Sequence, residues 1–172
     1  MRDINMNKGK GKFGVCVARH DPTGMRGSIC NEIQKYGKVE YGGRWGNRDK
    51  PKVGGLREDK IKYLSGAIYS VCAESHAVSH YCSEKIFESF MGGNIPIYWS
   101  KDIIAEEEIL KRESYCIYDI DEIEKMMKNN AEYKMKDIFT ENAYNILRRE
   151  YYDKLKSNLI KLLREKGYIH AL

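Results

Sequence analysis

Short apolar runs that alternate with helical segments are the feature that most restricts the fold of this chain. Five runs have the length and residue types of buried strands, at 12–20, 38–41, 67–74, 95–100 and 114–119. Between them, apolar residues at helical spacing and terminating glycines indicate helices at 25–37, 57–66 and 83–93. This alternation predicts an α/β fold, a Rossmann-like parallel sheet with helices on both faces.

The two ends of the chain differ from this pattern. Residues 1–11 are polar and rich in Gly and Lys, which indicates a flexible lead-in. From residue 121 onward the pattern is helical, with an apolar stripe along 141–166. With 172 residues, one domain is the natural expectation, here 12–172 with a helical C-terminus.

The charge pattern restricts the classes of binding partner but does not identify one. Thirty basic and 25 acidic residues give a net charge of +5, which suits nucleic acid, an anionic membrane surface or a phosphate-bearing ligand. The basic residues are interspersed with acidic ones and form none of the common nucleic-acid-binding motifs. We therefore expect no nucleic acid as a partner.

Cysteine usage and hydropathy bear on the compartment. The five cysteines form no CxxC pair and are odd in number, which predicts free, mostly buried thiols in a reducing compartment. No run of about 18 apolar residues predicts a membrane span, and the first residues lack the apolar stretch of a signal peptide. The expectation is a cytoplasmic chain, with peripheral membrane association left open.

Ligands of parallel α/β sheets bind beyond the carboxyl ends of the strands, here after residues 20, 41, 74 and 100. The third of these loops leads into a helix that opens with Ser83, a plausible N-cap, followed by Glu84 and Lys85. A cation in a first helical turn opposes the helix dipole, which makes sense beside a bound anion. The alternative is an ordinary solvated lysine, and the pattern alone does not decide between them.

Here the sequence resembles a known family, the α-1,3-fucosyltransferases of glycosyltransferase family 10. Within residues 72–100, the segments similar to its donor-binding signature are Glu74-Ser75-His76, Tyr81-Cys82-Ser83-Glu84-Lys85-Ile86, Phe90–Gly93 and Ile95-Pro96-Ile97-Tyr98-Trp99-Ser100. Upstream, two more segments are similar in the same order, Met25-Arg26-Gly27-Ser28 and Glu40-Tyr41-Gly42-Gly43-Arg44. The resemblance covers about residues 12–119.

The resemblance implies the C-terminal half of a GT-B glycosyltransferase, which binds GDP-fucose for transfer to an oligosaccharide, as in protein glycosylation. It assigns Arg26 and Lys85 to the two phosphates. Two cations and helix N–H groups stabilise a leaving diphosphate without a metal, so no cofactor is expected beyond the donor itself.

The resemblance also implies roles for other positions. Glu84 is expected to accept hydrogen bonds from ribose or sugar hydroxyls, and Tyr81 to lie near the nucleotide. Glu74, Ser75 and Arg44 are expected to line the same cleft. The sequence departs from the family where Ser75 replaces Asn, so the identity of the donor or the affinity for it could differ from that of the family.

Two further features have a functional and a structural interpretation. Asp119-Ile120-Asp121 is similar to the DxD metal motif of other glycosyltransferases, but it stands between a strand and a helix, so we interpret Asp119 as an N-cap. We therefore expect no metal site. His20 and His80 fall near the predicted cleft, where they either titrate usefully or are solvent-exposed or structural.

The family's general base belongs to an N-terminal acceptor domain, and no residue of this chain matches it. An inverting transfer needs such a base. We therefore expect the base, and the contacts to a glycan acceptor, to lie outside this chain. Whether the chain acts as an enzyme is left open: one hypothesis is the donor domain of a complete transferase, and the alternative is a truncated, non-catalytic nucleotide-sugar-binding module.

Overall fold

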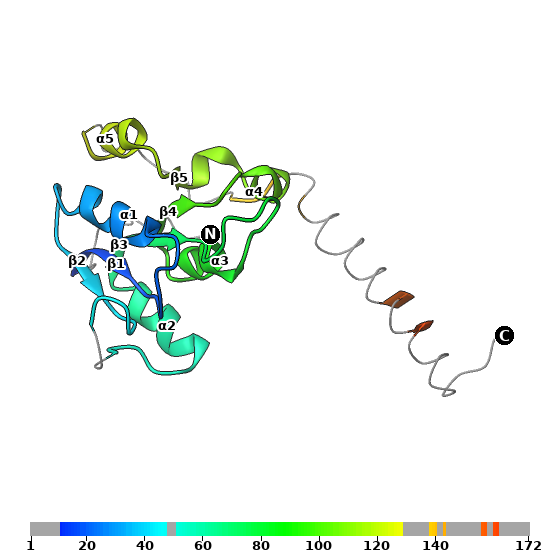
Figure 1. Ribbon diagram of the computed structural model, residues 1–172, viewed down its shortest axis with the longest axis horizontal. Helices are drawn as coiled ribbons and strands as arrows, with labels where there is room; N and C mark the ends of the chain where they lie inside the picture. The colour runs from blue at the N-terminus through cyan, green and yellow to red at the C-terminus, as the bar shows by residue number, and fades with distance from the viewer. Residues whose placement is uncertain are drawn as a thin grey trace, which may run out of the picture.

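The computed structural model describes residues 11–47, 51–128, 138–140, 143, 156–157 and 160–161. Its centre is a sheet of five parallel strands in the order β2-β1-β3-β4-β5 (Figure 1). The strands are β1 (Lys12–Cys16), β2 (Val39–Tyr41), β3 (Ala67–Ala73), β4 (Ile95–Trp99) and β5 (Cys116–Ile117). The predicted α/β, Rossmann-like fold is confirmed.

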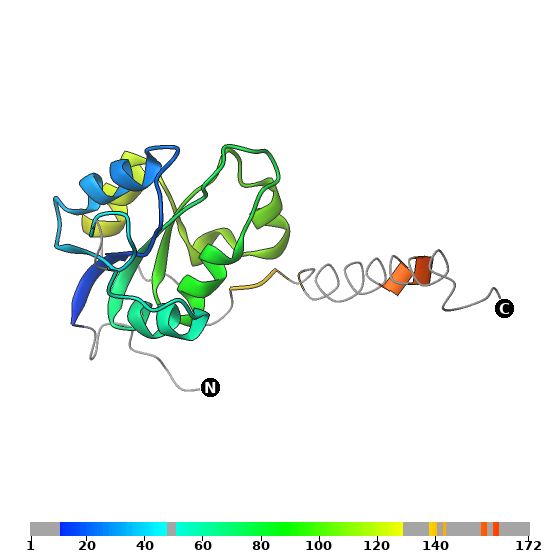
Figure 2. The same cartoon turned by 60° about the horizontal axis from the view of Figure 1, so that its bottom comes forward.

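Helices cover both faces of this sheet (Figure 2). α1 packs beside α5 on one face, and α2 packs beside α3 on the other. A short helix α4 and a 3-10 turn η1 join β4 to β5. The helical elements are α1 (Met25–Ile33), α2 (Arg57–Leu64), α3 (Glu84–Met91), α4 (Ile104–Ile109), η1 (Arg112–Ser114) and α5 (Ile120–Lys128).

The core is divided by the sheet, because successive side chains of a strand point to opposite faces. Cys16 at the end of β1 packs with Ile29 of α1, whereas its neighbour Val15 packs with Leu64 of α2. Of the five cysteines, all are free and four are buried, while Cys82 is half-buried. Free, mostly buried thiols were expected, and this is confirmed.

The strand order places a topological switch point at the carboxyl ends of β1 and β3. Gly14 of β1 pairs with Val39 of β2 on one side and with Tyr69 of β3 on the other. The chain thus runs outward from β1 to β2 and then crosses back over β1 to β3. Ligands of open α/β sheets bind at such a point, so the order itself directs attention to the loops that follow β1 and β3.

Some elements differ from the predictions. The first strand ends at Cys16, since the chain then turns and the carbonyl oxygen of Ala18 accepts the backbone N–H of Trp45 at 3.1 Å. α4 was not predicted, and it begins without a side-chain cap. The predicted helix at 141–166 and lead-in at 1–11 lie almost wholly outside the described residues. Within the described ranges, no helix is long and apolar enough to cross a membrane.

Candidate functional site

The loops that follow the strands are joined to one another at the carboxyl edge of the sheet. Gly42, just after β2, donates its N–H to the carbonyl oxygen of Cys16 at 2.9 Å. Glu74, just after β3, donates its N–H to the carbonyl oxygen of Trp99 at 2.9 Å. The segments after β1 and β2 are thus joined in one pair, and those after β3 and β4 in another; together they form the rim around the switch point.

Arg26 lies at this rim, in the first turn of α1, and is almost completely buried. Its guanidinium donates to the carbonyl oxygen of Ala73 at 2.9 Å and also to that of His20. The Asp21 carboxylate accepts the N–H groups of Arg26 and Gly27 at 3.2 and 2.9 Å. The donors at the start of α1 are thus occupied by Asp21, and the arginine joins the ends of β1 and β3.

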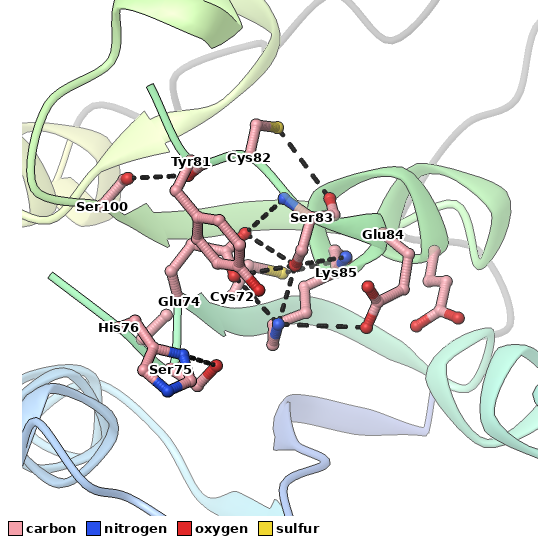
Figure 3. A network of polar contacts seen from close by, with 12 residues as sticks. Cys72, Glu74, Ser75, His76, Tyr81, Cys82, Ser83, Glu84, Lys85 and Ser100 are labelled. Atoms are coloured by element: carbon pink, nitrogen blue, oxygen red, sulfur yellow. Dashed lines mark hydrogen bonds and ion pairs between the residues drawn. The ribbon is translucent and has the colours of Figure 1, made fainter. Parts of the chain in front are cut away.

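Glu74 is fully buried and organises the start of α3 (Figure 3). One of its carboxylate oxygens accepts the backbone N–H of Ser83 at 2.9 Å, and the Ser83 hydroxyl lies within 2.8 Å of both oxygens. The ammonium of Lys85 lies 2.9 Å from the other oxygen and 2.7 Å from the Ser83 hydroxyl. Glu74 is therefore buried, but its hydrogen bonds fix the positions of Ser83 and Lys85, which lie closer to the surface.

Lys85 retains partial access to solvent, with 21% of its side chain exposed. Ser83 is the N-cap of α3, as predicted, and its hydroxyl accepts the backbone N–H of Lys85. Glu84 is more exposed, and its carboxylate lies 3.9 Å from the Lys85 ammonium. The cation at the start of α3 is therefore Lys85. It is paired with the buried carboxylate of Glu74 and lies near the exposed carboxylate of Glu84.

The loop between β3 and α3 carries an aromatic pair. The ring of Tyr81 meets that of His76 edge to face, with centroids 6.2 Å apart, and the Ser75 hydroxyl lies 3.1 Å from the Nδ1 atom of His76 (Figure 3). Ser100 donates to the carbonyl oxygen of Tyr81 at 3.1 Å. The structure therefore brings the predicted residues Ser75 and Tyr81 together, with His76, which the sequence did not single out, between them.

The tip of the same loop is held by Asp102, in the loop after β4. Asp102 accepts the hydroxyl of Ser79 and, at 3.2 Å, the backbone N–H of His80. The Ser79 bond is the main reason that the pKa of Asp102 lies below its ordinary value. His80 has a left-handed backbone with φ of 56°, which is uncommon for a residue other than glycine. His80 is exposed and serves here in a loop clamp.

Arg44 is exposed on the loop after β2, and His20 is exposed after β1. The loop after β2 packs closely against the loop after β1 at Gly43, where an added Cβ would lie 2.0 Å from the carbonyl oxygen of Ala18. The glycine is required by this close approach of two backbones. It brings the loop of Arg44 to the switch point.

A buried polar cluster beneath Glu74 was missed by sequence reasoning. The hydroxyl of Tyr98, in β4, lies 3.3 Å from Glu74 and hydrogen-bonds to Glu106 of α4. Burial raises the pKa of the Glu106 carboxyl and raises that of the nearby Cys82 thiol to about 12. The Glu106 Oε2 atom has no hydrogen-bond partner. In the sequence, Tyr98 resembles a core residue and Glu106 one of a solvated run of glutamates.

Asp119 caps α5, as predicted. Its carboxylate accepts the backbone N–H groups of Asp121 and Glu122 at 2.9 and 3.1 Å. Its role as N-cap is therefore confirmed. Among the residues that the structure describes, no group of three metal-binding side chains comes together.

A groove of about 440 Å³ lies along α2, lined by Lys12, Lys52 and Tyr63 among others. The ammonium groups of Lys12 and Lys52 lie 3.7 and 3.9 Å from the same carboxylate oxygen of Glu40, and Lys12 also stacks on the Tyr63 ring. These cations are engaged with the protein itself. The rim at the switch point is the better candidate, because the predicted residues gather there.

Comparison with known proteins relates this fold to a glycosyltransferase. No family model and no curated protein matches the chain. Crystal structures of α1,3-fucosyltransferase, determined without a named ligand, with GDP-fucose and with GDP, match with a TM-score of 0.58 and 23% identity over 81% of this chain. The chain spans only 37–38% of the length of those proteins. It shares the fold of that part of an α1,3-fucosyltransferase.

Proposed function

We propose that this chain is the donor-binding domain of a glycosyltransferase and that it binds a GDP-sugar, with GDP-fucose as the donor. One observation carries the proposal. Arg26 and Lys85, the two cations predicted to hold a diphosphate, are anchored to consecutive residues at the end of β3: Arg26 to Ala73, and Lys85 to Glu74. They come from two different helices, and both attach to the end of β3, beside the switch point of the sheet. Structures with this fold include one with GDP-fucose.

The chemistry of transfer explains why two cations suit this place. When the glycosyl bond breaks, negative charge develops on the departing diphosphate, and fixed cations stabilise it without reorganisation. Arg26 supplies a buried, preoriented charge, and Lys85 supplies an accessible one at the N-terminus of α3. The dipole of that helix favours an anion at the same position. The proposed mechanism needs no metal ion.

The other rim residues are proposed to select the nucleotide sugar. Tyr81 and His76 present aromatic surface from the loop that precedes α3, and Glu84 offers an exposed carboxylate for ribose or sugar hydroxyls. Ser75 offers a hydroxyl, and Arg44 a cation from the neighbouring loop. Glu74 acts from beneath, because it is fully buried and positions Ser83 and Lys85 rather than touching the ligand.

Calorimetric titration tests this function directly. GDP is expected to bind more tightly than UDP, and guanosine more weakly than GDP. Lys85→Ala should weaken GDP by about tenfold or more, because a charge-assisted bond contributes about 1.5–3 kcal/mol, and guanosine should be unaffected. Lys101→Ala, at an exposed lysine, is the control. UDP binding as tight as GDP binding would contradict the assignment.

A lost lysine also leaves Glu74 without its ion pair, so a second variant separates the two effects. Lys85→Ala combined with Glu74→Gln removes both charges and keeps a hydrogen-bond acceptor for Ser83. If the double variant is folded and still binds GDP like the unmodified protein, the diphosphate model is wrong. If it binds GDP weakly, the loss belongs to the ligand and not to the fold.

Transfer itself is proposed to require a base and an acceptor site from elsewhere. The carboxylates at the rim have other roles: Glu74 and Glu106 are buried, Asp21 accepts backbone N–H groups of α1, and Glu84 is proposed to bind the donor. Incubation of the chain with GDP-fucose and an N-acetyllactosamine-type acceptor is expected to give little product. Turnover at about 1 s⁻¹ or faster would show that this chain holds its own base.

A further inference from the structure

The buried carboxylates Glu74 and Glu106 face a single hydroxyl. The oxygen of Tyr98 lies 3.3 Å from the Oε1 atom of Glu74 and hydrogen-bonds to the Oε1 atom of Glu106. Glu74 is fully buried and Glu106 is 1% exposed. A phenolic hydroxyl has one proton and can satisfy only one of these oxygens as donor. The second contact needs a proton on one of the two carboxyl groups.

Glu74 is the member of the pair with compensated charge. Its two oxygens accept from the N–H of Ser83, from the Ser83 hydroxyl and from the Lys85 ammonium. All of these favour the carboxylate form, because hydrogen bonds and an ion pair stabilise the charge. The Tyr98 hydroxyl completes this set as a donor.

Glu106 is the member without such compensation. Its Oε2 atom has no hydrogen-bond partner, and the donors near its carboxyl group carry no charge: the Tyr98 hydroxyl, the Cys82 thiol and its own backbone N–H. The titratable groups around it are Tyr98 from β4, Glu74 from β3, Cys82 from the loop before α3 and Tyr115 from the segment before β5. These groups are neutral or acidic, so they disfavour a second buried negative charge. The proton therefore belongs on Glu106.

We propose that Glu106 is a neutral carboxylic acid that donates to Tyr98, which in turn donates to Glu74, and that this neutrality leaves the charge of Lys85 available to an anionic ligand. If Glu106 ionised, a second negative charge would hold the ammonium more tightly and repel a phosphate. Glu106 is thus a positioning residue that acts through Tyr98 and Glu74. The part concerning the ligand rests on the proposed function, with the diphosphate as the anion.

The protonation state is tested without any ligand, by infrared spectroscopy of the full chain. The spectrum of the unmodified protein minus that of Glu106→Gln should contain the carbonyl stretch of a protonated acid. Tyr98→Phe should shift this band, since it removes the hydrogen-bond partner. Glu107→Gln, at the exposed neighbour, is the control and should remove only carboxylate bands. If the difference for Glu106→Gln contains only carboxylate bands, the proposal is overturned.

The consequence for the ligand is tested by GDP titrations from about pH 5 upward, because burial raises the pKa of the Glu106 carboxyl above its ordinary value. GDP affinity of the unmodified protein should fall by about tenfold as the acid band disappears. Glu106→Gln should lack this step and retain only the change that belongs to the nucleotide, whose terminal phosphate titrates near pH 6. An identical pH profile in both proteins would overturn the coupling.

The two readouts separate this inference from the proposed function. An acid band in a protein that binds no GDP at any pH leaves Glu106 neutral but refutes the GDP-sugar site. GDP binding without the band keeps the site but refutes the neutral Glu106. The band and the pH step together support both.

Discussion

The guanidinium of Arg26 donates to the carbonyl oxygen of Ala73 at 2.9 Å, and so ties the first turn of α1 to the last residue of β3. The same group also holds the carbonyl oxygen of His20, beyond the end of β1. One buried cation therefore joins the backbone beyond the end of β1 to the end of β3, the two adjacent strands at the switch point. A residue proposed to bind phosphate is at the same time part of the framework.

Arg26→Ala should lower the free energy of unfolding by about 3 kcal/mol, because hydrogen bonds to charged groups contribute about 1.5–3 kcal/mol each. Urea unfolding followed by circular dichroism measures this change. Arg19→Ala is the matched control, since Arg19 is exposed in the loop that precedes α1 and should change stability by less than about 0.5 kcal/mol. Equal unfolding midpoints for both variants would show that the hydrogen bonds of Arg26 to Ala73 and His20 contribute nothing to stability.

Glu74→Gln should make GDP bind more tightly, by up to roughly tenfold, about 1.4 kcal/mol. The amide keeps an acceptor for Ser83 but no longer neutralises Lys85. Calorimetry measures the affinity. Glu88→Gln is the control, because Glu88 is also buried and paired with a lysine, Lys60, but at the interface of α3 with α2. A folded Glu74→Gln protein with unchanged or weaker GDP affinity contradicts this prediction.

Gly43→Ala should destabilise the fold by about 1–3 kcal/mol, the usual cost of overpacking. The new methyl group would lie 2.0 Å from the carbonyl oxygen and 2.6 Å from the nitrogen of Ala18, so the backbone must move. Gly55→Ala provides the comparison, since a Cβ there meets nothing within 4 Å. Thermal unfolding of the two variants should differ clearly, and similar melting temperatures would mean that the loop yields easily.

Asp119→Ala should cost about 1 kcal/mol of stability through the lost helix cap and leave GDP affinity unchanged. Asp121→Ala should have a smaller effect, because the Asp119 carboxylate accepts the cap bonds. Titrations with and without Mg²⁺ or Mn²⁺ should give the same GDP affinity in all three proteins. A metal requirement that disappears in either variant would restore the DxD interpretation.

Glu106 should make the stability of the protein depend on pH. In the unfolded chain this carboxyl ionises at its ordinary pKa of 4.5, whereas burial raises the pKa in the folded state. Between these two values the unfolded state releases a proton that the folded state keeps, so stability falls as pH rises. Glu106→Gln should lack this decline, and its stability relative to the unmodified protein should increase with pH across the same interval. A constant difference between the two would contradict the raised pKa.

Helix caps and strand ends were predicted correctly because they depend on local sequence. Ser83 precedes an apolar helical stripe and caps α3, and Asp119 caps α5 in the same way. The strand at 67–74 was predicted to within one residue of its observed end at Ala73. Caps and strand ends depend on a few neighbouring residues, so they can be read from the sequence without knowledge of the tertiary structure.

The polar cluster behind the rim was beyond local reasoning. Glu106 is the first of three consecutive glutamates, and nothing in that run says which of them becomes buried. The partner of Lys85 was missed for a similar reason, because Glu74 is eleven residues away and meets it only after α3 has packed on the sheet. The sequence indicated a cation at the start of α3, while the charge available there depends on tertiary neighbours.

The position of β1 in the sheet has a consequence for synthesis on the ribosome. Of the five strands of this sheet, β1 emerges first, yet it lies between β2 and β3, and its partner Tyr69 follows long after Gly14. A nascent chain that stops before Ala67 holds only two of the five strands, and a two-stranded sheet is marginal in water. Arg26 donates to the carbonyl oxygen of Ala73, so the hydrogen bond that joins α1 to β3 cannot form until Ala73 has left the exit tunnel.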